Sequence, residues 1–283
     1  MSITLTGLEG KVAIVTGAGR MRSIGRPIAM ALARAGCDVV LTGTGRPREH
    51  YPQDEQRVGW RDIDSVADDI RSLGRRALPV VSDVSKAEAV QALVERVVRE
   101  FGKVDVLVNN AGATRGTDRV PVLDLAASEW HRVIDTNLHG TFHMSKACAA
   151  RMVAQGHGGS IVNISSLAAR LLAPETAAYA TSKIAVNALS TVMAAELGPK
   201  GIRVNAVCPG IIDTSRLDDV GRSELWATML KTFVPLGRAG TGDDIANLVA
   251  FLCSDQGAWI TGQHIHVDGG HSFMPRRGGP GAS

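Results

Sequence analysis

Segments typical of β-strands and of α-helices alternate along almost the whole of this sequence. Short apolar runs such as Val12–Val15 and Val204–Val207 are typical of buried parallel strands, and residues of helical spacing separate them. The other predicted strands are 39–41, 78–81, 104–108, 161–164 and 265–267, and the predicted helices are 28–35, 90–101, 122–155, 173–198 and 243–254. This alternation predicts an α/β fold with helices on both faces of a doubly wound parallel sheet. We find no internal repeat and no break in composition, so we expect a single domain over residues 1–283.

Composition is that of an ordinary globular protein. Of the 283 residues, 45% are hydrophobic and 21% are charged, which excludes a disordered chain. No apolar run approaches the roughly 18 residues of a membrane span, and the N-terminus lacks the pattern of a signal peptide. The four cysteines are far apart and form no C-x-x-C pair, which indicates neither a disulfide framework nor a zinc site. We therefore expect a cytoplasmic protein without a membrane partner.

The net charge is +3, and much of the positive charge lies in the first quarter of the chain, where eleven arginines fall between residues 20 and 76. Nucleic acid is one class of partner for such a cluster. The segment has few aromatic residues for stacking on bases and no known nucleic-acid-binding motif. We therefore expect a small molecule that carries phosphate, and no nucleic acid.

A glycine-containing turn follows the first predicted strand and opens the first predicted helix. It reads Thr16-Gly17-Ala18-Gly19-Arg20-Met21-Arg22-Ser23-Ile24-Gly25. Glycine lets the backbone approach a pyrophosphate closely, and the helix N-terminus offers N–H donors to an anion. No Gly-Lys-Ser/Thr follows, which excludes the phosphate-binding loop of P-loop enzymes.

Tyr179 and Lys183 form Tyr-x-x-x-Lys in a predicted helix, where residues four apart face the same side. A phenol of ordinary pKa, near 10, is a poor acid–base group at neutral pH, but a neighbouring ammonium lowers that pKa. Such a pair can exchange a proton with a carbonyl or alcohol oxygen. Taken alone, the pattern is also compatible with an exposed tyrosine and a solvated lysine that share a helix by chance.

Polar or glycine-containing segments end three further predicted strands. They are Asn109-Asn110-Ala111-Gly112, Ser165-Ser166 and Pro209-Gly210, after the strands 104–108, 161–164 and 204–207. Ligands bind at the carboxyl ends of the strands in open α/β sheets. The position of these segments therefore favours a binding site at that edge.

Together these segments resemble the short-chain dehydrogenase/reductases, over about residues 7–270. The resemblance also rests on Ser82-Asp83-Val84, Asp135-Thr136-Asn137, the thirteen-residue spacing of Ser166 and Tyr179, Pro209–Thr214 and Val267-Asp268-Gly269-Gly270. It implies a Rossmann fold and an enzyme that interconverts a ketone and a secondary alcohol with a nicotinamide cofactor. The nearest members are 3-oxoacyl-thioester reductases, a label that spans many substrates. The resemblance also implies a homotetramer built on the helices near 122–155 and 173–198.

The resemblance assigns four residues to catalysis. Tyr179 would be the general acid in reduction and the base in oxidation. Lys183 would bind the ribose hydroxyls of the nicotinamide nucleotide and lower the pKa of Tyr179. Ser166 would hydrogen-bond the substrate oxygen, and Asn137, at a break in its helix, would position a water that links Lys183 to bulk solvent.

The resemblance also implies a dinucleotide site. Asp83 and Val84 would flank the adenine, and Asn110, Ala111 and Gly112 would flank the adjacent ribose. Ile212 and Thr214 would hold the carboxamide. The predicted cofactor set is completed by Tyr179, Lys183, Gly17, Arg20, Arg22, Ser23, Ile24, Thr44, Arg46, Pro209 and Gly210.

The glycine turn departs from the family pattern Thr-Gly-x-x-x-Gly-x-Gly. Gly17 and Gly25 are eight positions apart instead of six, and Ser23 replaces the middle glycine. Enoyl-thioester reductases of the same superfamily also have a longer turn with a Ser-Ile pair. Six residues separate their Tyr and Lys, however, whereas three do here. We therefore expect ketone/alcohol chemistry rather than reduction of a C=C bond.

Cofactor choice depends on the end of the second strand, where NAD-preferring members usually carry an acidic residue. Here the segment reads Leu41-Thr42-Gly43-Thr44-Gly45-Arg46, with no acid at the expected place. Arg20 or Arg22, with Thr44 and Arg46, could cradle a 2′-phosphate. We therefore predict NADP(H), and NAD(H) is the alternative if these arginines only solvate the surface.

Several segments lie outside this pattern. The polar insertion 43–60 would close over the cofactor, cover a neighbouring subunit or form a tolerated surface loop. Residues 217–233 predict an amphipathic lid, which favours a substrate with an apolar part, although such a stripe is as often ordinary packing. The Gly- and Pro-rich tail 272–283 is expected to be flexible. Ser85 and Glu88 predict a capping box before the helix 90–101.

Two alternatives, a non-catalytic protein and a metal site, have less support in the sequence. A non-catalytic nucleotide sensor or scaffold on the same fold would show an eroded catalytic set, and here all four residues are present. His139 and His143 are four apart on a predicted helix, but no third ligand lies near them in the sequence. We therefore expect an enzyme with no metal site.

Overall fold

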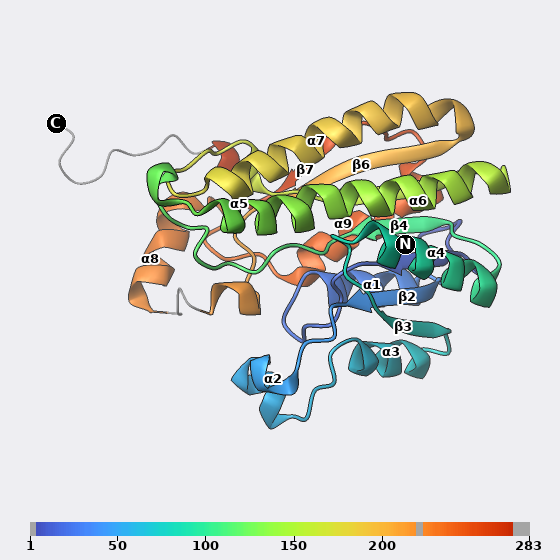
Figure 1. Cartoon of the computed structure of the whole chain (residues 1–283), viewed down its shortest axis with the longest axis horizontal. Helices are drawn as coiled ribbons and strands as arrows, with labels where there is room; N and C mark the ends of the chain where they lie inside the picture. The colour runs from blue at the N-terminus through green and yellow to red at the C-terminus, as the bar shows by residue number, and fades with distance from the viewer. Residues whose placement is uncertain (1–3, 219–222, 274–283) are drawn as a thin grey trace.

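In the computed structural model, which describes residues 4–218 and 223–273, seven parallel strands form one sheet in the order β3-β2-β1-β4-β5-β6-β7 (Figure 1). The strands are β1 (Val12–Val15), β2 (Asp38–Gly43), β3 (Ala77–Val81), β4 (Val106–Asn109), β5 (Gly159–Ile164), β6 (Ile202–Pro209) and β7 (His264–Val267). Each strand predicted from the sequence is present. The expected doubly wound parallel sheet in a single domain is confirmed.

Strand β1 lies inside the sheet, and all four of its residues are buried. It pairs with β2 on one side, where Val12 lies opposite Asp38, and with β4 on the other, where Ala13 lies opposite Val106. The chain leaves β1 toward one edge and returns through β4 toward the other edge. Loops that follow the two strands therefore diverge, and a crevice opens at their carboxyl ends.

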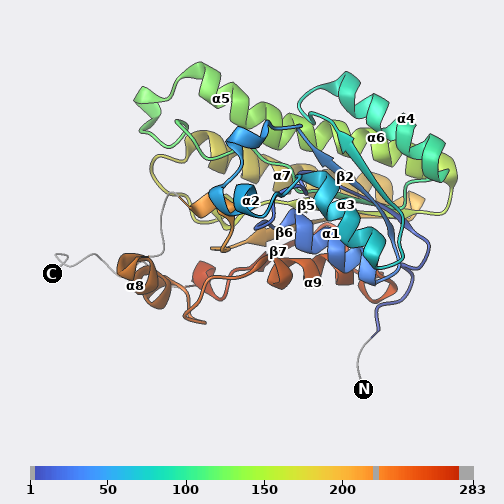
Figure 2. The same cartoon turned by 90° about the horizontal axis from the view of Figure 1, so that it is seen from below.

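Helices cover both faces of the sheet, as Figure 2 shows. One face carries α1 (Gly25–Arg34), α3 (Ile63–Ser72) and α9 (Gly242–Cys253), and the other carries α4 (Ala87–Phe101), α6 (Gly140–Gln155) and α7 (Ala177–Leu197). Ile28 and Val249 belong to the first core, and Leu93 and Met144 to the second. Because both faces are buried, the strands are apolar without alternation.

The remaining elements are shorter. They are α2 (Gln53–Arg57) within the insertion, α5 (Ala127–Ile134), α8 (Glu224–Phe233) and three-residue 3₁₀ helices at Arg48–His50, Val122–Asp124, Leu167–Ala169, Gly198–Lys200, Ser215–Leu217, Asp255–Gly257 and His271–Phe273. A π-helix, Asp135–His139, joins α5 to α6. The predicted helix 122–155 is therefore not one regular α-helix: α5 and α6 are joined by the π-helix, and Asn137 lies in that π-helix.

The predicted capping box at Ser85 and Glu88 is wrong. Helix α4 begins at Ala87 after Lys86, and no side chain caps it. The Ser85 N–H instead donates to the Asp83 carboxylate at 2.9 Å, which ends the preceding loop in a local turn. A capping box does form at the start of α9, between Thr241 and Asp244.

Within the described residues, no helix is long and apolar enough to cross a membrane. The four cysteines are buried and unpaired. Of the tail 272–283, only the first two residues are described, so the predicted flexibility lies outside the described part of the chain.

Candidate active site

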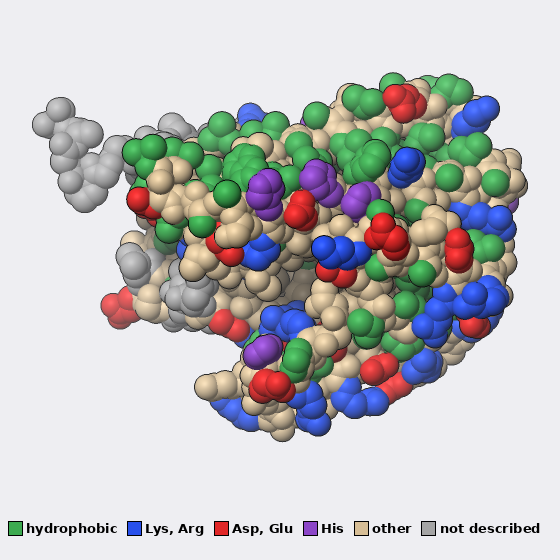
Figure 3. Space-filling model, viewed as in Figure 1, with side chains coloured by type: hydrophobic (Ala, Val, Ile, Leu, Met, Phe, Trp, Pro, Cys, Tyr) green, Lys and Arg blue, Asp and Glu red, His purple; other side chains and the backbone are tan. Residues whose placement is uncertain are grey.

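A cavity of about 940 Å³ opens at the carboxyl edge of the sheet. Figure 3 shows the molecule hollowed between the layer of α5 and α6 and the layer of α2, with Lys and Arg side chains around the hollow. All predicted site residues except Asn137 line the cavity: Gly17, Arg20, Arg22, Ser23, Ile24, Thr44, Arg46, Asp83, Val84, Asn110, Ala111, Gly112, Ser166, Tyr179, Lys183, Pro209, Gly210, Ile212 and Thr214. The fold therefore brings almost the whole set into one space.

The glycine turn packs tightly against the end of β4. Gly17 has φ +67°, and a Cβ there would lie 2.8 Å from the Cα of Ala111. A Cβ on Gly25 would lie 2.5 Å from Nδ2 of Asn110, which itself donates to the carbonyl oxygens of Thr16 and Gly17 at 2.9 Å each. Neither glycine can carry a side chain without displacing this contact. The lengthened turn thus still keeps close backbone packing.

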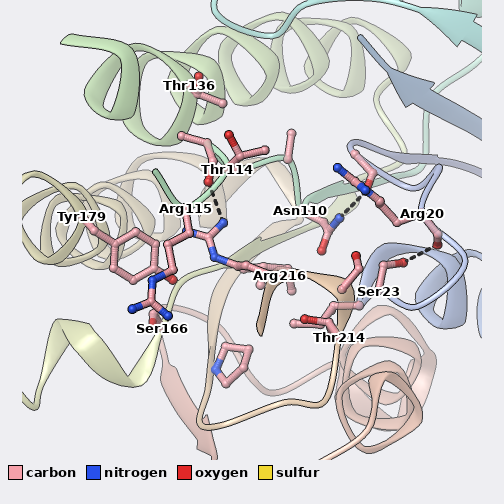
Figure 4. Close-up of a pocket in the computed structure, with 18 of the residues that line it drawn as sticks. Arg20, Ser23, Asn110, Thr114, Arg115, Thr136, Ser166, Tyr179, Thr214 and Arg216 are labelled. Atoms are coloured by element: carbon pink, nitrogen blue, oxygen red, sulfur yellow. Dashed lines mark hydrogen bonds between the residues drawn. The ribbon is translucent and has the colours of Figure 1, made fainter. Parts of the chain in front are cut away.

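Ser23 organises the end of the lengthened turn. Its hydroxyl donates to the carbonyl oxygen of Arg20 at 2.9 Å (Figure 4). The same hydroxyl accepts the N–H of Arg26 at 3.1 Å. Ile24, the residue before α1, offers no side-chain cap to the helix. Backbone N–H groups that no side chain caps at the N-terminus of a helix can bind an anion such as a pyrophosphate.

The insertion 43–60 is bonded to the same turn. Glu55 accepts the N–H of Met21 at 2.8 Å, and Trp60 Nε1–H donates to the carbonyl oxygen of Gly19 at 2.7 Å. Glu55 is 1% exposed. The insertion therefore packs on the enlarged turn of its own chain instead of lying free on the surface, and the two departures from the family pattern fit one another.

Sequence reasoning missed Asp62, a buried cavity residue that follows the insertion. A Cβ built on Gly43, the last residue of β2, would lie 3.2 Å from Asp62 Oδ2, and a Cβ on Gly19 would lie 1.6 Å from Oδ1. The Asp62 carboxylate thus fills the space that an acidic side chain at the end of β2 would occupy. No local signal marks it, because nineteen positions separate Asp62 from Gly43.

Most of the predicted phosphate-binding arginines lie near acids. Arg22 forms ion pairs with Asp54 at 2.7 Å and Asp218 at 2.6 Å. The hydrogen bond with Asp218 is the largest effect that raises the pKa of Arg22, although partial burial lowers it. Arg46 lies 3.2 Å from Asp62.

Burial is the largest effect on the pKa of Arg20. Burial and the nearby charge of Arg46 lower the pKa of Arg20, whereas Glu55 and Asp62 raise it. Of the acids at this end of the cavity, Asp54, Glu55 and Asp62 come from the insertion and its flank, and Asp218 comes from the segment after β6. The local charge is therefore far less positive than the sequence suggests.

Tyr179 and Lys183 lie one turn apart in α7. Lys183 is 6% exposed, and its Nζ donates to the carbonyl oxygen of Ile164 at 2.8 Å and lies 5.8 Å from the centroid of the Tyr179 ring. Burial lowers the pKa of Lys183, and Tyr179 acts against that shift. The ammonium and the phenol are thus held together at the end of β5.

The surroundings of Tyr179 favour its ionised form. Burial by itself raises the pKa of the phenol, but Arg216, Lys183, a hydrogen bond with Ser166 and Arg119 together outweigh burial and lower the pKa. Arg119 and Arg216 were not among the predicted residues. Both also line the cavity. Arg216 could have been suspected because it follows Thr214 by two positions, whereas Arg119 lies in a loop without a motif.

Asn137 is fully buried in the π-helix and does not line the cavity. Its side-chain oxygen accepts the N–H of Ala113 at 2.8 Å, and its Nδ2 donates to the hydroxyl of Ser182 at 2.9 Å. The residue thereby joins the loop after β4 to α7. Its predicted part in a water relay stays a prediction.

In the described part of the chain, α8 does not cover this cavity as the predicted apolar lid would. Residues 219–222 of that segment are outside the described residues, and among those described Leu217 lines the cavity whereas no residue of α8 does. In Figure 1, α8 lies to the side of the main body. Arg216, adjacent to Leu217, makes this wall polar and charged.

Comparison with known proteins finds relatives over almost the whole length of the chain. Residues 17–272 match the protein-family model described as enoyl-(acyl carrier protein) reductase. The chain is 40% identical to a 3-oxoacyl-[acyl-carrier-protein] reductase of Staphylococcus aureus over 92% of this chain and 97% of that one. It is 34% identical to the 2-dehydro-3-deoxy-D-gluconate 5-dehydrogenase of Escherichia coli, over 95% and 98%.

Among solved structures, carveol dehydrogenase from Mycobacterium avium in complex with NAD is similar, with a TM-score of 0.85 and 32% identity over 94% of this chain and 99% of that one. Sequence relatives and structural neighbours therefore agree on one group of enzymes, as the motifs around Tyr179 and the glycine turn indicate. The chain belongs to the short-chain dehydrogenase/reductase family of NAD(P)-dependent oxidoreductases.

Proposed function

We propose that this oxidoreductase transfers a hydride between a nicotinamide dinucleotide and a ketone or secondary alcohol, with Tyr179 as general acid and base. One observation carries the proposal. Tyr179 lies one helical turn from the buried Lys183 and lines the same cavity as Ser166 and the glycine turn. The three residues between Tyr179 and Lys183 support ketone chemistry over reduction of a C=C bond.

The cavity suits a dinucleotide. Gly17 and Gly25 leave no room for a Cβ, which matches a turn built for close approach of a pyrophosphate. We propose that Asp83 and Val84 flank the adenine, and that Ile212 holds the carboxamide. The remaining predicted cofactor residues line the same cavity. The nicotinamide, when bound, supplies or accepts the hydride.

The chain's own residues handle the proton and the alignment. In reduction, the Tyr179 hydroxyl donates its proton to the substrate oxygen, and in oxidation the phenolate accepts the proton of the alcohol. Lys183 stabilises the phenolate by its charge. Ser166 hydrogen-bonds the substrate oxygen and so fixes the position of the reacting carbon. Asn137 holds the loop at Ala113 and α7 in register, and we propose that it also positions a water for proton supply.

Replacing Tyr179 with Phe tests the mechanism. Because the phenyl ring keeps the packing but has no proton to exchange, we expect kcat/KM to fall by about 10²–10⁴-fold. The dinucleotide Kd, measured by isothermal titration calorimetry, is expected to change by less than about threefold. Substantial residual activity in Tyr179→Phe would contradict the mechanism. Cofactor binding without any turnover in the wild type would instead support a sensor or scaffold.

For the cofactor, the ion pairs support NAD(H) as the preferred form and weigh against the NADP(H) prediction. The Asp62 carboxylate beside Gly43 is suited to accept hydrogen bonds from the ribose hydroxyls and repels a 2′-phosphate. Arg22 and Arg46 are already paired with acids. One observation favours NADP(H): Nη1 of Arg46 is buried without a hydrogen bond among the described residues.

Titration with NADH and NADPH separates the two forms, and Asp62→Asn identifies the cause. We expect tighter NADH binding in the wild type, and a shift toward NADPH in Asp62→Asn, since the repelling charge is gone and Arg46 is released. Asp64→Asn is the matched control, because Asp64 is exposed in α3 and does not line the cavity. Tighter NADPH binding in the wild type would restore the prediction made from the sequence.

We also propose that the protein is a homotetramer. Support comes from exposed apolar side chains on α6 and α7, namely Phe142 (43% exposed), Val153 (39%), Ile184 (41%) and Val192 (54%). Light scattering coupled to size exclusion measures the mass directly. A monomer at micromolar concentration would contradict this assembly.

A further inference from the structure

Arginine side chains gather around Tyr179, at the end of the cavity away from Arg20 and Ser23 (Figure 4). The guanidinium carbon of Arg119 lies 4.3 Å from the centroid of the Tyr179 ring, and that of Arg216 lies 5.1 Å from it. Arg115 lines the same cavity. The place where the substrate would meet the phenol is therefore cationic.

Acidic neighbours balance only part of this charge. The buried carboxylate of Asp118 lies 3.3 Å from Nε of Arg119 and 3.4 Å from Nη2 of Arg132, so two arginines share it. Glu129 lies 2.9 Å from the same nitrogen of Arg132. Glu175 also lines the cavity, but its side chain is exposed to solvent. Asp118 and Glu129 thus offset the charges of Arg119 and Arg132 but not that of Arg216.

Arg216 is held by the backbone instead of an acid. Its Nη1 donates to the carbonyl oxygen of Ala113 at 2.6 Å, and within residues 4–218 and 223–273 it forms no ion pair with a carboxylate. A carbonyl contact directs a guanidinium without neutralising it. The remaining donors of Arg216 are then available to a ligand in the cavity.

Arg119 is largely buried, with 17% of its side chain exposed. Burial lowers its pKa, Asp118 and Tyr179 raise it, and the nearby charges of Arg216 and Arg115 lower it further. Its Nε is buried and, among the described residues, forms only the 3.3 Å ion pair with Asp118 and no hydrogen bond. Like charges held together out of water are unfavourable by themselves, and an anion between them would offset that cost.

We propose that the substrate carries a carboxylate that binds Arg119 and Arg216 beside Tyr179, so that the enzyme interconverts an oxo acid and a hydroxy acid. The proposal rests on the function proposed above and specifies its substrate class. In reduction the carbonyl carbon gains the hydride, its π bond to oxygen breaks, and the oxygen gains the Tyr179 proton. The carboxylate stays unchanged and serves to orient the substrate. A guanidinium fork matches the two oxygens of a carboxylate, which makes such a contact directional as well as strong.

The competing explanation is that the arginines only lower the pKa of Tyr179. That role predicts equal preference for charged and neutral ketones, whereas a carboxylate subsite predicts discrimination between them. The two explanations therefore differ in the ratio of kcat/KM for a charged ketone to kcat/KM for a neutral one, and not in the size of either value.

We would compare straight-chain oxo acids of four to six carbons with their methyl esters, using NADH and NADPH. In the wild type we expect kcat/KM to favour the acid by about tenfold or more, the usual effect of a charge-assisted hydrogen bond. In Arg119→Gln the acid-to-ester ratio should fall toward one, and Arg119→Lys should keep part of it. Arg99→Gln is the control, because Arg99 is exposed on α4 outside the cavity.

A binding measurement covers the case in which no compound of this panel is turned over. Malonate, an unreactive dicarboxylate, is titrated into enzyme saturated with dinucleotide, and we expect Arg119→Gln to weaken its binding by about tenfold. Failure of malonate to bind, or tighter binding of inorganic phosphate, would overturn the carboxylate subsite. Equal rates for acids and esters would do the same while leaving the oxidoreductase function intact. Ketone turnover that is unchanged in Tyr179→Phe would contradict the proposed function, whether or not malonate binds.

Discussion

The side chain of Tyr179 lies among cationic groups that act on its ionisation. Burial raises the pKa of the phenol, but Arg216, Lys183, the hydrogen bond with Ser166 and Arg119 lower it more. The deprotonated phenol is the base for alcohol oxidation. The kcat/KM for oxidation should therefore rise with pH through the pKa of Tyr179, at a pH below the ordinary value near 10.

Replacing Arg216 tests this balance. Arg216→Gln removes a charge that lowers the pKa of Tyr179, so the midpoint of the rise should move to higher pH. Arg216→Lys keeps a positive charge and should move it less. The measurement is kcat/KM for alcohol oxidation between pH 6 and 11 in both variants, with the midpoint as readout. An unmoved midpoint in Arg216→Gln would show that this charge does not act on the phenol.

Gly25 provides a second prediction at the scale of a residue. In Gly25→Ala the new Cβ would lie 2.5 Å from Nδ2 of Asn110 and 2.7 Å from the carbonyl oxygen of Gly17. We expect this crowding to lower the free energy of unfolding by about 1–3 kcal/mol and to weaken dinucleotide binding. Gly198→Ala is the matched control, because no atom of a neighbouring element lies within 4 Å of a Cβ built there and the φ of Gly198 is −52°. Urea unfolding and calorimetric titration compare the two, and equal effects would contradict the packing argument.

At the scale of elements, the insertion 43–60 and the glycine turn act as one unit. Trp60 donates its indole N–H to the carbonyl oxygen of Gly19 at 2.7 Å, and its ring also lies 5.2 Å from the guanidinium carbon of Arg26. Trp60→Phe keeps an aromatic ring but leaves that carbonyl without its donor. We expect a loss of about 1 kcal/mol in the free energy of unfolding and weaker dinucleotide binding.

Trp259→Phe is the control for this change, since the Trp259 side chain is 99% exposed. Calorimetric titration is the appropriate measurement, because it does not depend on tryptophan fluorescence. If both variants bind the dinucleotide like the wild type, the insertion does not support the turn.

Local sequence patterns predicted some of the elements better than others. The strands and the long helices follow from apolar runs and helical spacing, because burial on both faces of a sheet imposes those patterns directly. The cap at Ser85 failed because the Asp83 carboxylate took the Ser85 N–H. The sequence could not place α8, because amphipathicity shows that a helix packs against something but not against what.

At the scale of the whole molecule, the cavity joins both halves of the sheet. Its wall includes residues after β1 and β2 as well as residues after β4, β5 and β6. A dinucleotide that binds only the folded state should therefore stabilise the entire sheet. At 100 times its Kd we expect about 2.7 kcal/mol, measured as a rise in the unfolding temperature by circular dichroism at fixed protein concentration. An early unfolding transition that the dinucleotide leaves in place would contradict this coupling.

The sequence by itself determined the class of fold, the position of the glycine turn and the pairing of Tyr179 with Lys183, because each depends on residues close together in the chain. Nearly all of the site residues that it predicted line the cavity, since they belong to motifs at strand ends. Only the tertiary structure decided which charges meet. Asp62 lies against Gly43, and Arg119 and Arg216 flank Tyr179, across separations that no motif spans. Electrostatic interactions depend on distance in space and on burial, so the charge that cofactor and substrate encounter could be read only from the folded chain.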